Sequence, residues 1–331
     1  MTKMRHRTLS IQLTKQCNAS CEHCGTYSGP RAHARLTPPQ IHNAICEASY
    51  GDFREVVFTG GEPTLLGLDL MKAIAFSTSL GLTARLVTNG WWAKNAAAAE
   101  RWVIQLMDAG LAELNVSTGD QHARFVSVDK VVNAACAAVR GGLRTTILIE
   151  LVETRAVTRA AFEQLDSIAS LRRDFPPTLL SIYESPWMPL DSGVTEGYPN
   201  GLAVNRGNLA RRGPCDNVLQ TITISPDGVI GACCGIGMRS ISELQLGHID
   251  NTTLSTACRD GDSNALMQRL RFEGPERILA SAAEIDPRIH WEDMYAHRCQ
   301  ACRRVFLDPA VRSVLQNRAP AQPCSDGKDC F

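Results

Sequence analysis

The first 184 residues alternate between short apolar runs and longer amphipathic stretches. Apolar runs bounded by turn-forming residues predict six strands, over Leu9–Leu13, Glu55–Thr59, Ala84–Thr88, Glu113–Ser117, Thr145–Val152 and Leu179–Glu184. Apolar positions at helical spacing predict five helices between them, over Pro38–Ser49, Leu66–Leu80, Ala93–Ala109, Asp129–Arg140 and Ala160–Leu171. This order predicts an α/β fold with a parallel sheet and helices on its outer face. Six units are too few for an eight-stranded barrel, so we expect an open, partial (β/α)6 barrel.

The alternation stops after Glu184. A segment rich in proline and glycine follows, and it predicts a crossover loop. Two short apolar runs then flank the turn Ser225–Gly228 and predict a β-hairpin, followed by two or three helices and a last helix over Arg303–Asn317. We therefore expect four segments: a barrel domain over 1–184, a linker over 185–214, a small α+β domain over 215–318 and a tail over 319–331.

Composition and charge limit the classes of protein to which the chain can belong. The chain has 331 residues, 44% hydrophobic and 21% charged, which is enough apolar surface for a sizeable core. Its 34 basic residues balance its 34 acidic residues, which argues against a nucleic-acid binder that depends on a strong basic field. The N-terminus lacks the apolar region of a signal peptide, and no uninterrupted apolar stretch approaches about 18 residues. We expect a cytoplasmic protein that binds neither nucleic acid nor a membrane.

The thirteen cysteines are the unusual feature of the composition. An odd number without a secretion signal disfavours a disulfide framework, and clustered cysteines in a reducing compartment are more often metal ligands. Cys46, Cys136 and Cys258 are solitary and lie in helix-like segments, where we interpret them as small buried hydrophobic residues. The other cysteines fall into groups that carry candidate chemistry.

The first group, Cys17-x3-Cys21-x2-Cys24, directly follows the first predicted strand. Three thiolates on one loop can each hold one iron of a cubane and leave the fourth iron open. A zinc site with three cysteines and a histidine is the alternative, although His23 lies between two ligands and would coordinate under strain. Gly60-Gly61-Glu62-Pro63 follows the second strand, where the glycines allow close backbone approach and the glutamate can accept a hydrogen bond from an ammonium group.

With these two motifs the sequence resembles the radical S-adenosylmethionine (radical SAM) superfamily, over about residues 7–184. The resemblance implies that the three cysteines bind a [4Fe-4S] cluster whose open iron is chelated by SAM. It also implies a set of SAM-binding residues at the strand ends: Gly60, Gly61 and Glu62 near the amino group, Asn89 in a Thr-Asn-Gly turn, and Ser117 and Asp120 at ribose or carboxylate contacts. For Ser117 and Asp120 a capped turn is the alternative. His23 departs from the family, which often has an aromatic residue there.

The second group joins distant parts of the chain. Cys215 and Cys233 flank the predicted hairpin, and Cys299-x2-Cys302 follows some sixty-five residues later. Four thiolates in this arrangement can ligate either a zinc ion or an iron–sulfur cube. The region resembles the twitch domain, the shortened relative of the SPASM domain that follows many radical SAM barrels. That resemblance implies one auxiliary [4Fe-4S] cluster, with structural zinc as the alternative.

Three further cysteines are not assigned as metal ligands. Cys234 is either a packed thiol or a hydrogen-atom donor to a substrate radical. Cys324 and Cys330 belong either to a loose tail or to a second site. Asp120-x-His122 is either a proton acceptor near the barrel mouth or a surface turn.

The resemblance implies an oxidoreductase that cleaves SAM to a 5′-deoxyadenosyl radical and abstracts a substrate hydrogen. An auxiliary cluster would complete a two-electron oxidation, such as the dehydrogenation of an alcohol. Because the chain begins almost at its first strand, we expect a small-molecule substrate rather than a peptide, and a low-potential electron donor such as flavodoxin or ferredoxin. The alternatives are a redox-neutral epimerase, a peptide-crosslinking or peptide-epimerising enzyme, and a non-catalytic iron–sulfur redox protein.

Overall fold

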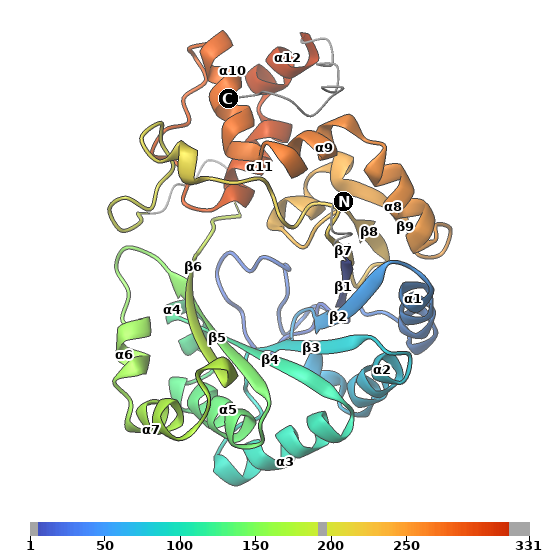
Figure 1. Cartoon of the computed structure of the whole chain (residues 1–331), viewed down its shortest axis with the longest axis vertical. Helices are drawn as coiled ribbons and strands as arrows, with labels where there is room; N and C mark the ends of the chain where they lie inside the picture. Colours follow the sequence, from blue (N-terminus) through green and yellow to red (C-terminus); the bar gives the residue numbers. More distant parts are fainter. Residues whose placement is uncertain (1–5, 191–196, 318–331) are drawn as a thin grey trace.

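The structure is a computed structural model that describes residues 6–190 and 197–317. Its strands are β1 (Arg7–Gln12), β2 (Phe53–Thr59), β3 (Thr83–Thr88), β4 (Leu111–Thr118), β5 (Arg144–Leu151), β6 (Leu180–Pro186), β7 (Thr221–Ile224), β8 (Val229–Gly231) and β9 (Gln245–His248). They form a sheet in the order β6-β5-β4-β3-β2-β1-β7-β8-β9. The first six are parallel and curve into an open ring (Figure 1). This is the α/β partial barrel that the hydrophobic pattern predicts.

Helices cover the outer side of the ring (Figure 1). In the barrel they are α1 (Pro38–Tyr50), α2 (Leu68–Ser79), α3 (Ala96–Asp108), α4 (Asp120–Ala123), α5 (Val128–Arg140), α6 (Arg159–Glu163) and α7 (Asp166–Asp174). Alternate strand residues such as Ile11, Phe58 and Leu86 are fully buried against these helices in one hydrophobic core. Thr37 caps α1 through a capping box with Gln40, as its position in the sequence favours.

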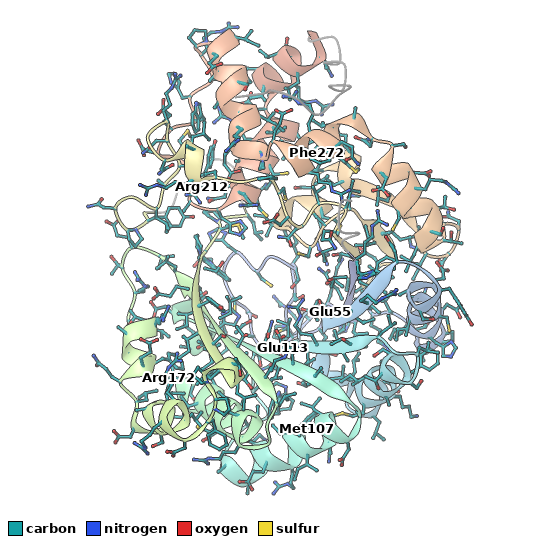
Figure 2. The ribbon with its side chains drawn as sticks, viewed as in Figure 1. Glu55, Met107, Glu113, Arg172, Arg212 and Phe272 are labelled. Carbon is teal, nitrogen blue, oxygen red and sulfur yellow. The ribbon has the colours of Figure 1, made fainter. Side chains whose placement is uncertain are left out.

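The opposite faces of the same strands line the inside of the ring, and they carry charged side chains on β2 to β4 and two exposed apolar side chains on β5 and β6. Arg85 of β3 pairs with Glu55 of β2 at 2.8 Å and with Glu113 of β4 at 3.7 Å. Figure 2 labels both glutamates on the inner side of the ring. On β5 and β6, Leu148 and Tyr183 are register partners on this inner face, and they are 39% and 56% exposed. The inside of the barrel is therefore accessible rather than packed shut.

Two of the helices predicted as continuous are each divided into two shorter helices. The helix expected over Ala160–Leu171 is two helices, α6 and α7, because the chain is extended at Leu165. The break lets Phe162 of α6 and Ile168 of α7 both reach the buried core. The helix expected over Arg303–Asn317 is also two helices, α11 (Arg298–Leu307) and α12 (Pro309–Asn317). Pro309 disfavours a helical conformation at the residue before it, and Asp308 is extended.

The predicted hairpin is confirmed, and it extends the barrel sheet. β7 pairs in parallel with β1, whereas β8 and β9 follow in antiparallel pairing. The turn closes where the Ser225 N–H donates to the Val229 carbonyl at 2.9 Å. The sequence pattern does not predict β9. The hairpin therefore places the C-terminal part of the chain beside β1.

The C-terminal part has a hydrophobic core of its own. Its helices are α8 (Leu254–Asp262), α9 (Ala265–Phe272) and α10 (Pro275–Ile285), followed by α11 and α12. Ile278, Trp291 and Phe306 are among its buried side chains. Across the part of the chain that the structure describes, no helix is long and apolar enough to cross a membrane.

Candidate functional site: two groups of cysteines at the barrel mouth

The loop between β1 and α1 carries the first three cysteines, and it lies across the open centre of the ring (Figure 1). Cys17 is 9% exposed, while Cys21 and Cys24 are half-buried. Burial raises the pKa of Cys17 to about 11 and the pKa of Cys21 to about 12, and the neighbouring cysteines add to both rises. The structure therefore brings the three predicted ligands close enough to interact electrostatically. Because thiols must lose their protons to bind metal, any metal binding at this loop would release protons.

Gly60 and Gly61 hold a second loop against the first. The Gly61 N–H donates to the Thr14 carbonyl at 2.6 Å, and the Glu62 N–H donates to the Gln16 carbonyl at 2.8 Å. A Cβ at Gly60 would lie 2.6 Å from the Thr14 oxygen, and one at Gly61 would lie 2.2 Å from the Gln16 oxygen. Only glycine permits this approach. The paired glycines thus fix the backbone that leads into the cysteine loop.

Glu62 is fully buried and organises the ends of β2 and β3. One carboxylate oxygen accepts hydrogen bonds from the Thr64 hydroxyl at 2.6 Å and from the Thr88 hydroxyl at 2.7 Å. The other accepts from the Asn89 N–H at 2.8 Å. Burial raises the pKa of Glu62 above its ordinary value, although its four hydrogen bonds oppose this rise. The carboxylate is therefore engaged within the protein.

Asn89 connects Glu62 to the cysteine loop. Its backbone N–H bonds to Glu62, and its side-chain amide donates to the Cys17 sulfur at 3.7 Å and to the Asn18 oxygen at 2.9 Å. Only 6% of the Asn89 surface is exposed. The predicted site residues of three strand ends, after β1, β2 and β3, are thus in direct contact.

Ser117 lies near the C-terminal end of β4, and Asp120 begins the short helix α4 that follows. Ser117 is half-buried on the inner face. The Asp120 carboxylate accepts backbone hydrogen bonds from Ala156 at 2.9 Å and from Val157 at 3.0 Å. Asp120 therefore fixes the loop that follows β5, and its carboxylate is directed to that loop.

Sequence reasoning missed Glu150, at the end of β5. Its Oε1 accepts from the backbone N–H groups of Gln121 and His122, whereas its Oε2 lies 3.6 Å from His122 Nδ1. Within the described residues, that Oε2, His122 Nδ1 and Trp187 Nε1 are buried without hydrogen-bond partners. A Cβ at Gly119 would lie 1.8 Å from Glu150 Cγ, so the glycine makes room for this carboxylate. A single acidic residue within the apolar run from Ile147 to Val152 is the signal that could have found it.

The unpartnered groups face the first cysteine group. The Cys21 thiol donates to the Gln121 carbonyl at 3.9 Å, and the charge of Glu150 helps to raise the pKa of Cys21. His122 also meets Trp187 edge-on, with ring centroids 6.0 Å apart. Buried polar groups normally have hydrogen-bond partners, so three atoms beside the cysteine loop that lack one among the described residues indicate a ligand-binding region.

The second group of cysteines converges on one pocket in the C-terminal part. Cys215 precedes β7, Cys233 follows β8, and Cys299 and Cys302 lie one turn apart on α11. All four line the same narrow pocket, with Val218, Leu244, Leu270 and Pro275 among its apolar walls. A Cβ at Gly235 would lie 2.8 Å from the Cys299 sulfur, so a glycine admits this thiol. The donor set is four sulfurs without a carboxylate or imidazole, which suits an iron–sulfur cluster or zinc.

The pKa values of these thiols reflect both burial and crowding. Burial raises the pKa of Cys299 to about 12 and raises the pKa values of Cys233 and Cys302 well above the ordinary value. Neighbouring thiolates, including Cys215, raise them further. In the residues that the structure describes, no group of three or more Cys, His, Asp or Glu has the arrangement expected for a single metal ion. Cys234 is exposed, and Cys324 and Cys330 lie outside the described residues.

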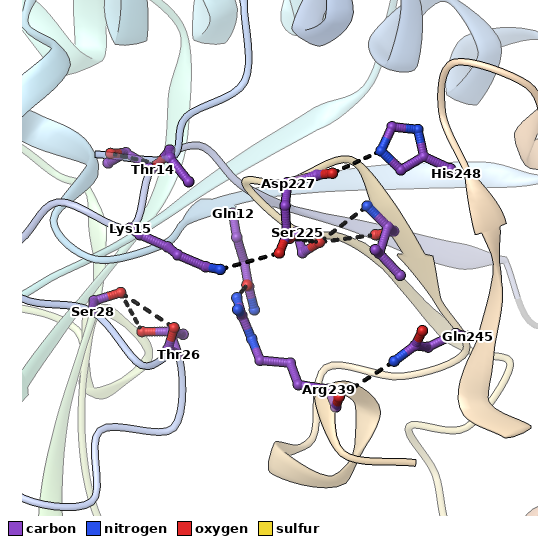
Figure 3. A network of polar contacts seen from close by, with 12 residues as sticks. Gln12, Thr14, Lys15, Thr26, Ser28, Ser225, Asp227, Arg239, Gln245 and His248 are labelled. Carbon is purple, nitrogen blue, oxygen red and sulfur yellow. Dashed lines mark hydrogen bonds and ion pairs between the residues drawn. The ribbon is translucent and has the colours of Figure 1, made fainter. Parts of the chain in front are cut away.

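Polar contacts connect the two cysteine groups. Lys15 in the first loop pairs with Asp227 in the hairpin turn at 3.1 Å, and Arg239 donates to Gln12 at the end of β1 (Figure 3). A second connection runs through Leu190. Its N–H donates to His23 Nδ1 at 3.3 Å, and its carbonyl accepts from Arg303, the residue after Cys302.

The solitary cysteines differ from both groups. Cys136 and Cys258 are 7% and 5% exposed, which confirms them as buried residues, whereas Cys46 is half-buried. The Cys46 sulfur lies 3.7 Å from His42 Nδ1 on the same helix.

Comparisons with known proteins agree with the motifs. Residues 11–152 match the family model described as the Radical SAM superfamily. A Bacillus subtilis relative named putative peptide biosynthesis protein YydG is 28% identical over 131 residues, which are 39% of this chain and 41% of the relative. The GTP 3′,8-cyclase of Synechococcus elongatus is 30% identical over 178 residues, 51% of this chain and 52% of the cyclase. The chain thus spans about half the length of these curated relatives, or less.

A solved structure supports the fold over most of the chain. The structure described as anSMEcpe with bound AdoMet superimposes with a TM-score of 0.58 and covers 94% of this chain and 99% of that one, at 13% identity. At this identity the match concerns the fold. Together with the cysteine loop and the glycine loop, the family match leads to one conclusion: residues 11–152 form a radical SAM superfamily domain.

Proposed function

We propose that this chain is a radical SAM enzyme, with a [4Fe-4S] cluster at Cys17, Cys21 and Cys24 and SAM beside the glycine loop. When bound there, the cluster and SAM supply a 5′-deoxyadenosyl radical that removes a hydrogen atom from the substrate. The observation that carries this proposal is the contact chain from Glu62 through Asn89 to Cys17. It joins two motifs, Cys17–Cys24 and Gly60–Pro63, that are separated by 35 residues into one site.

The residues of the chain have separate tasks in this proposal. Gly60 and Gly61 press their loop onto the backbone of Thr14 and Gln16, and Glu62 fixes the ends of β2 and β3. The backbone groups of Gly60, Gly61 and Glu62 would then hold the amino acid part of SAM. Ser117 would contact SAM from β4. Because Asp120 bonds to the loop after β5, we propose that Glu150 and His122 meet the polar groups of SAM in its place.

We further propose that Cys215, Cys233, Cys299 and Cys302 hold an auxiliary [4Fe-4S] cluster. Their all-sulfur donor set and their apolar pocket support this assignment. A cluster held by these four thiols would supply an acceptor for one electron from the substrate radical. Loss of that electron and of a proton to solvent, after removal of the hydrogen atom, would make the net reaction a two-electron oxidation of the substrate.

We propose a peptide as the substrate, which replaces the small molecule expected from the sequence. The relative named a peptide biosynthesis protein supports this choice. So does the geometry of β6, an outer strand of the sheet whose Tyr183 is 56% exposed beside Leu148 on the inner face. An extended peptide can bind an outer strand through main-chain hydrogen bonds and place its side chains against exposed apolar residues.

Iron content and SAM cleavage test the enzyme assignment together. We expect about eight irons per reconstituted chain, and about four in a Cys17/Cys21/Cys24→Ala variant. With dithionite and SAM, the native protein should form 5′-deoxyadenosine and this variant should not. A matched Cys215/Cys233/Cys299→Ala variant should also keep about four irons but should still cleave SAM. Absence of 5′-deoxyadenosine from the native protein would exclude the proposed function, and zinc in place of iron in the Cys17/Cys21/Cys24→Ala variant would exclude the auxiliary cluster.

The substrate class needs a different measurement. A bacterial extract is divided into two portions, and one portion is digested to amino acids with protease. The rate of 5′-deoxyadenosine formation is then compared after adding each portion. A peptide substrate predicts stimulation by the undigested portion only, and Tyr183→Ala should reduce it. Equal stimulation by both portions would restore the small-molecule alternative.

A further inference from the structure

A tryptophan-rich pocket lies outside the barrel, between the end of β3 and α3. Its cavity volume is 280 Å³, and its lining residues are Trp91, Trp92, Lys94, Ala98, Arg101, Trp102 and Gln105. The lining includes two cations and no carboxylate. It therefore combines aromatic surface with positive charge, and it belongs neither to the cysteine groups nor to the inner face of the barrel.

The sequence builds this pocket from one turn and one helix face. Asn95 caps α3, so that Ala98, Arg101, Trp102 and Gln105 follow at helical spacing on one side. Trp92 is 2% exposed and forms the base, with its ring centroid 5.6 Å from that of Trp102. Packing of this kind makes the floor rigid and leaves the cations at the edge.

The two cations are available to a partner. Lys94 and Arg101 are exposed, and in residues 6–190 and 197–317 neither forms an ion pair. Lys94 lies over the ring of Trp91, 5.9 Å from its centroid. Glu100 is exposed on the same helix but does not line the pocket. The pocket surface is thus positive although the whole chain has a net charge of zero.

The pocket wall is directly connected to the cysteine loop. The Trp91 N–H donates to Asn89 Oδ1 at 3.0 Å, and the Asn89 amide donates to the Cys17 sulfur at 3.7 Å. On its other side, Trp91 Nε1 donates to the Thr64 hydroxyl at 2.9 Å, and Thr64 bonds to Glu62. A molecule seated in the pocket is therefore separated from a proposed cluster ligand by Trp91 and Asn89.

We propose that this pocket is the docking surface for an acidic electron-transfer protein that reduces the site at Cys17, Cys21 and Cys24. The inference rests on the proposed function, which requires one electron from outside the chain. The donor loses that electron and the iron–sulfur site gains it, with no bond made or broken. Tunnelling favours a short path, which the Trp91–Asn89–Cys17 contacts provide. Weak redox complexes have small interfaces in which charge complementarity steers association.

Binding is the first test, because it does not depend on turnover. Oxidised flavodoxin is the probe, titrated into the full-length protein while tryptophan fluorescence is recorded, at low and at high salt. The native protein should bind flavodoxin at low salt and lose affinity as salt rises. Lys94→Glu/Arg101→Glu should weaken binding by about tenfold or more, because both cations face an acidic partner.

A matched control changes net charge equally at a distant surface. Arg173 on α7 and Arg288 after α10 are 70% and 87% exposed, and Arg173→Glu/Arg288→Glu should bind flavodoxin as the native protein does. In Figure 2, Arg172 marks α7 at the lower left and Met107 marks α3 at the bottom, and α5 lies between these two helices. Equal weakening in both double variants would assign the effect to net charge and overturn the proposal. So would unchanged binding in the pocket variant.

The electron source separates this inference from the proposed function. With reduced flavodoxin as donor, the pocket variant should form 5′-deoxyadenosine about tenfold more slowly than the native protein. With dithionite, which needs no docking surface, the two rates should be equal. A native protein that forms no product with dithionite would refute the proposed function. Equal flavodoxin-driven rates in the pocket variant and the native protein would refute the docking surface alone.

Discussion

The two groups of cysteines are built in opposite ways. The first occupies eight consecutive residues, Cys17 to Cys24, on a loop over the centre of the ring. The second collects Cys215, Cys233 and the pair on α11 from three separate segments. A local group needs only its own loop, whereas a dispersed group needs the C-terminal fold. Ligation of the second group would therefore also cross-link that fold.

Their surroundings differ in the same sense. The first group is surrounded by polar contacts, through Asn89, Thr26 and the backbone of Gln121. Beside it lie three buried polar atoms that have no hydrogen-bond partner in the part of the chain that the structure describes. The second has mostly apolar walls and belongs to the C-terminal core. A polar, accessible setting suits a site that exchanges a small cofactor. An apolar, enclosed setting suits a cluster that stays bound.

The largest expected effect is on stability, and it separates the two groups. Ligation of Cys215 and Cys299 closes a loop of 84 residues, and by the chain-entropy argument a cross-link of that length contributes about 4–5 kcal/mol. Ligation of Cys17 and Cys24 closes a loop of seven residues and contributes about 2 kcal/mol. Thermal unfolding of the reconstituted protein should therefore fall by about 10 °C in Cys215/Cys233/Cys299→Ala and by about 5 °C in Cys17/Cys21/Cys24→Ala.

The same measurement on protein without metal is the control. Without a cross-link, the difference between the two triple variants should shrink, because only the loss of buried thiols remains. An equal drop in melting temperature for both reconstituted variants would contradict the cross-linking role of the second group.

Two glycine substitutions sharpen the comparison at single positions. Gly61→Ala places a Cβ 2.2 Å from the Gln16 carbonyl oxygen and must push the glycine loop away from the cysteine loop. A displacement of this size at a reacting site costs about a hundredfold in rate, or about 3 kcal/mol. We expect 5′-deoxyadenosine formation to fall by this factor while the second group keeps its iron.

Gly235→Ala is the matched change at the second group. Its Cβ would lie 2.8 Å from the Cys299 sulfur, so the thiol must turn away. We expect iron content to fall toward half, with SAM cleavage retained. Loss of SAM cleavage in Gly235→Ala, or loss of auxiliary iron in Gly61→Ala, would show that the two sites are not independent.

The local group could be predicted from sequence, because its residues are neighbours in the chain. Cys17, Cys21, Cys24 and Gly60–Glu62 each follow a predicted strand, and parallel strands bring their carboxyl ends to one edge. What spacing does not give is the direction in which a side chain points. Asp120 and Glu62 are both acidic residues at strand ends, yet Asp120 bonds to the loop after β5, and Glu62 bonds to Thr64, Thr88 and Asn89.

The dispersed features needed the fold. The pairing of β7 with β1 joins strands more than 200 residues apart in the chain. The local pattern of apolar residues predicts each strand but does not indicate which strand it pairs with. The break at Leu165 is similar, since no proline or glycine announces it and only the packing of Phe162 and Ile168 explains it. The tryptophan pocket arises from a turn and a helix that are individually ordinary. These features depend on long-range contacts rather than on local sequence preference.

The smallest expected effect concerns Cys258, a buried thiol outside both groups that serves as a reference. Burial raises the pKa of Cys258 to about 11 from an ordinary value of 9.0, with Arg7 opposing the rise. Below pH 9 the thiol is protonated in both the folded and the unfolded chain, so its contribution is constant. As pH rises from 9 toward 11, the unfolded chain releases this proton more readily than the folded chain. The free energy of unfolding therefore falls, by about 1 kcal/mol once solvent screening is counted.

Urea unfolding of the native protein and of Cys258→Ala over this range should show a steeper loss of unfolding free energy with pH in the native protein. Parallel profiles would mean that Cys258 ionises alike in both states, and that burial alone does not account for the raised pKa values in the two groups.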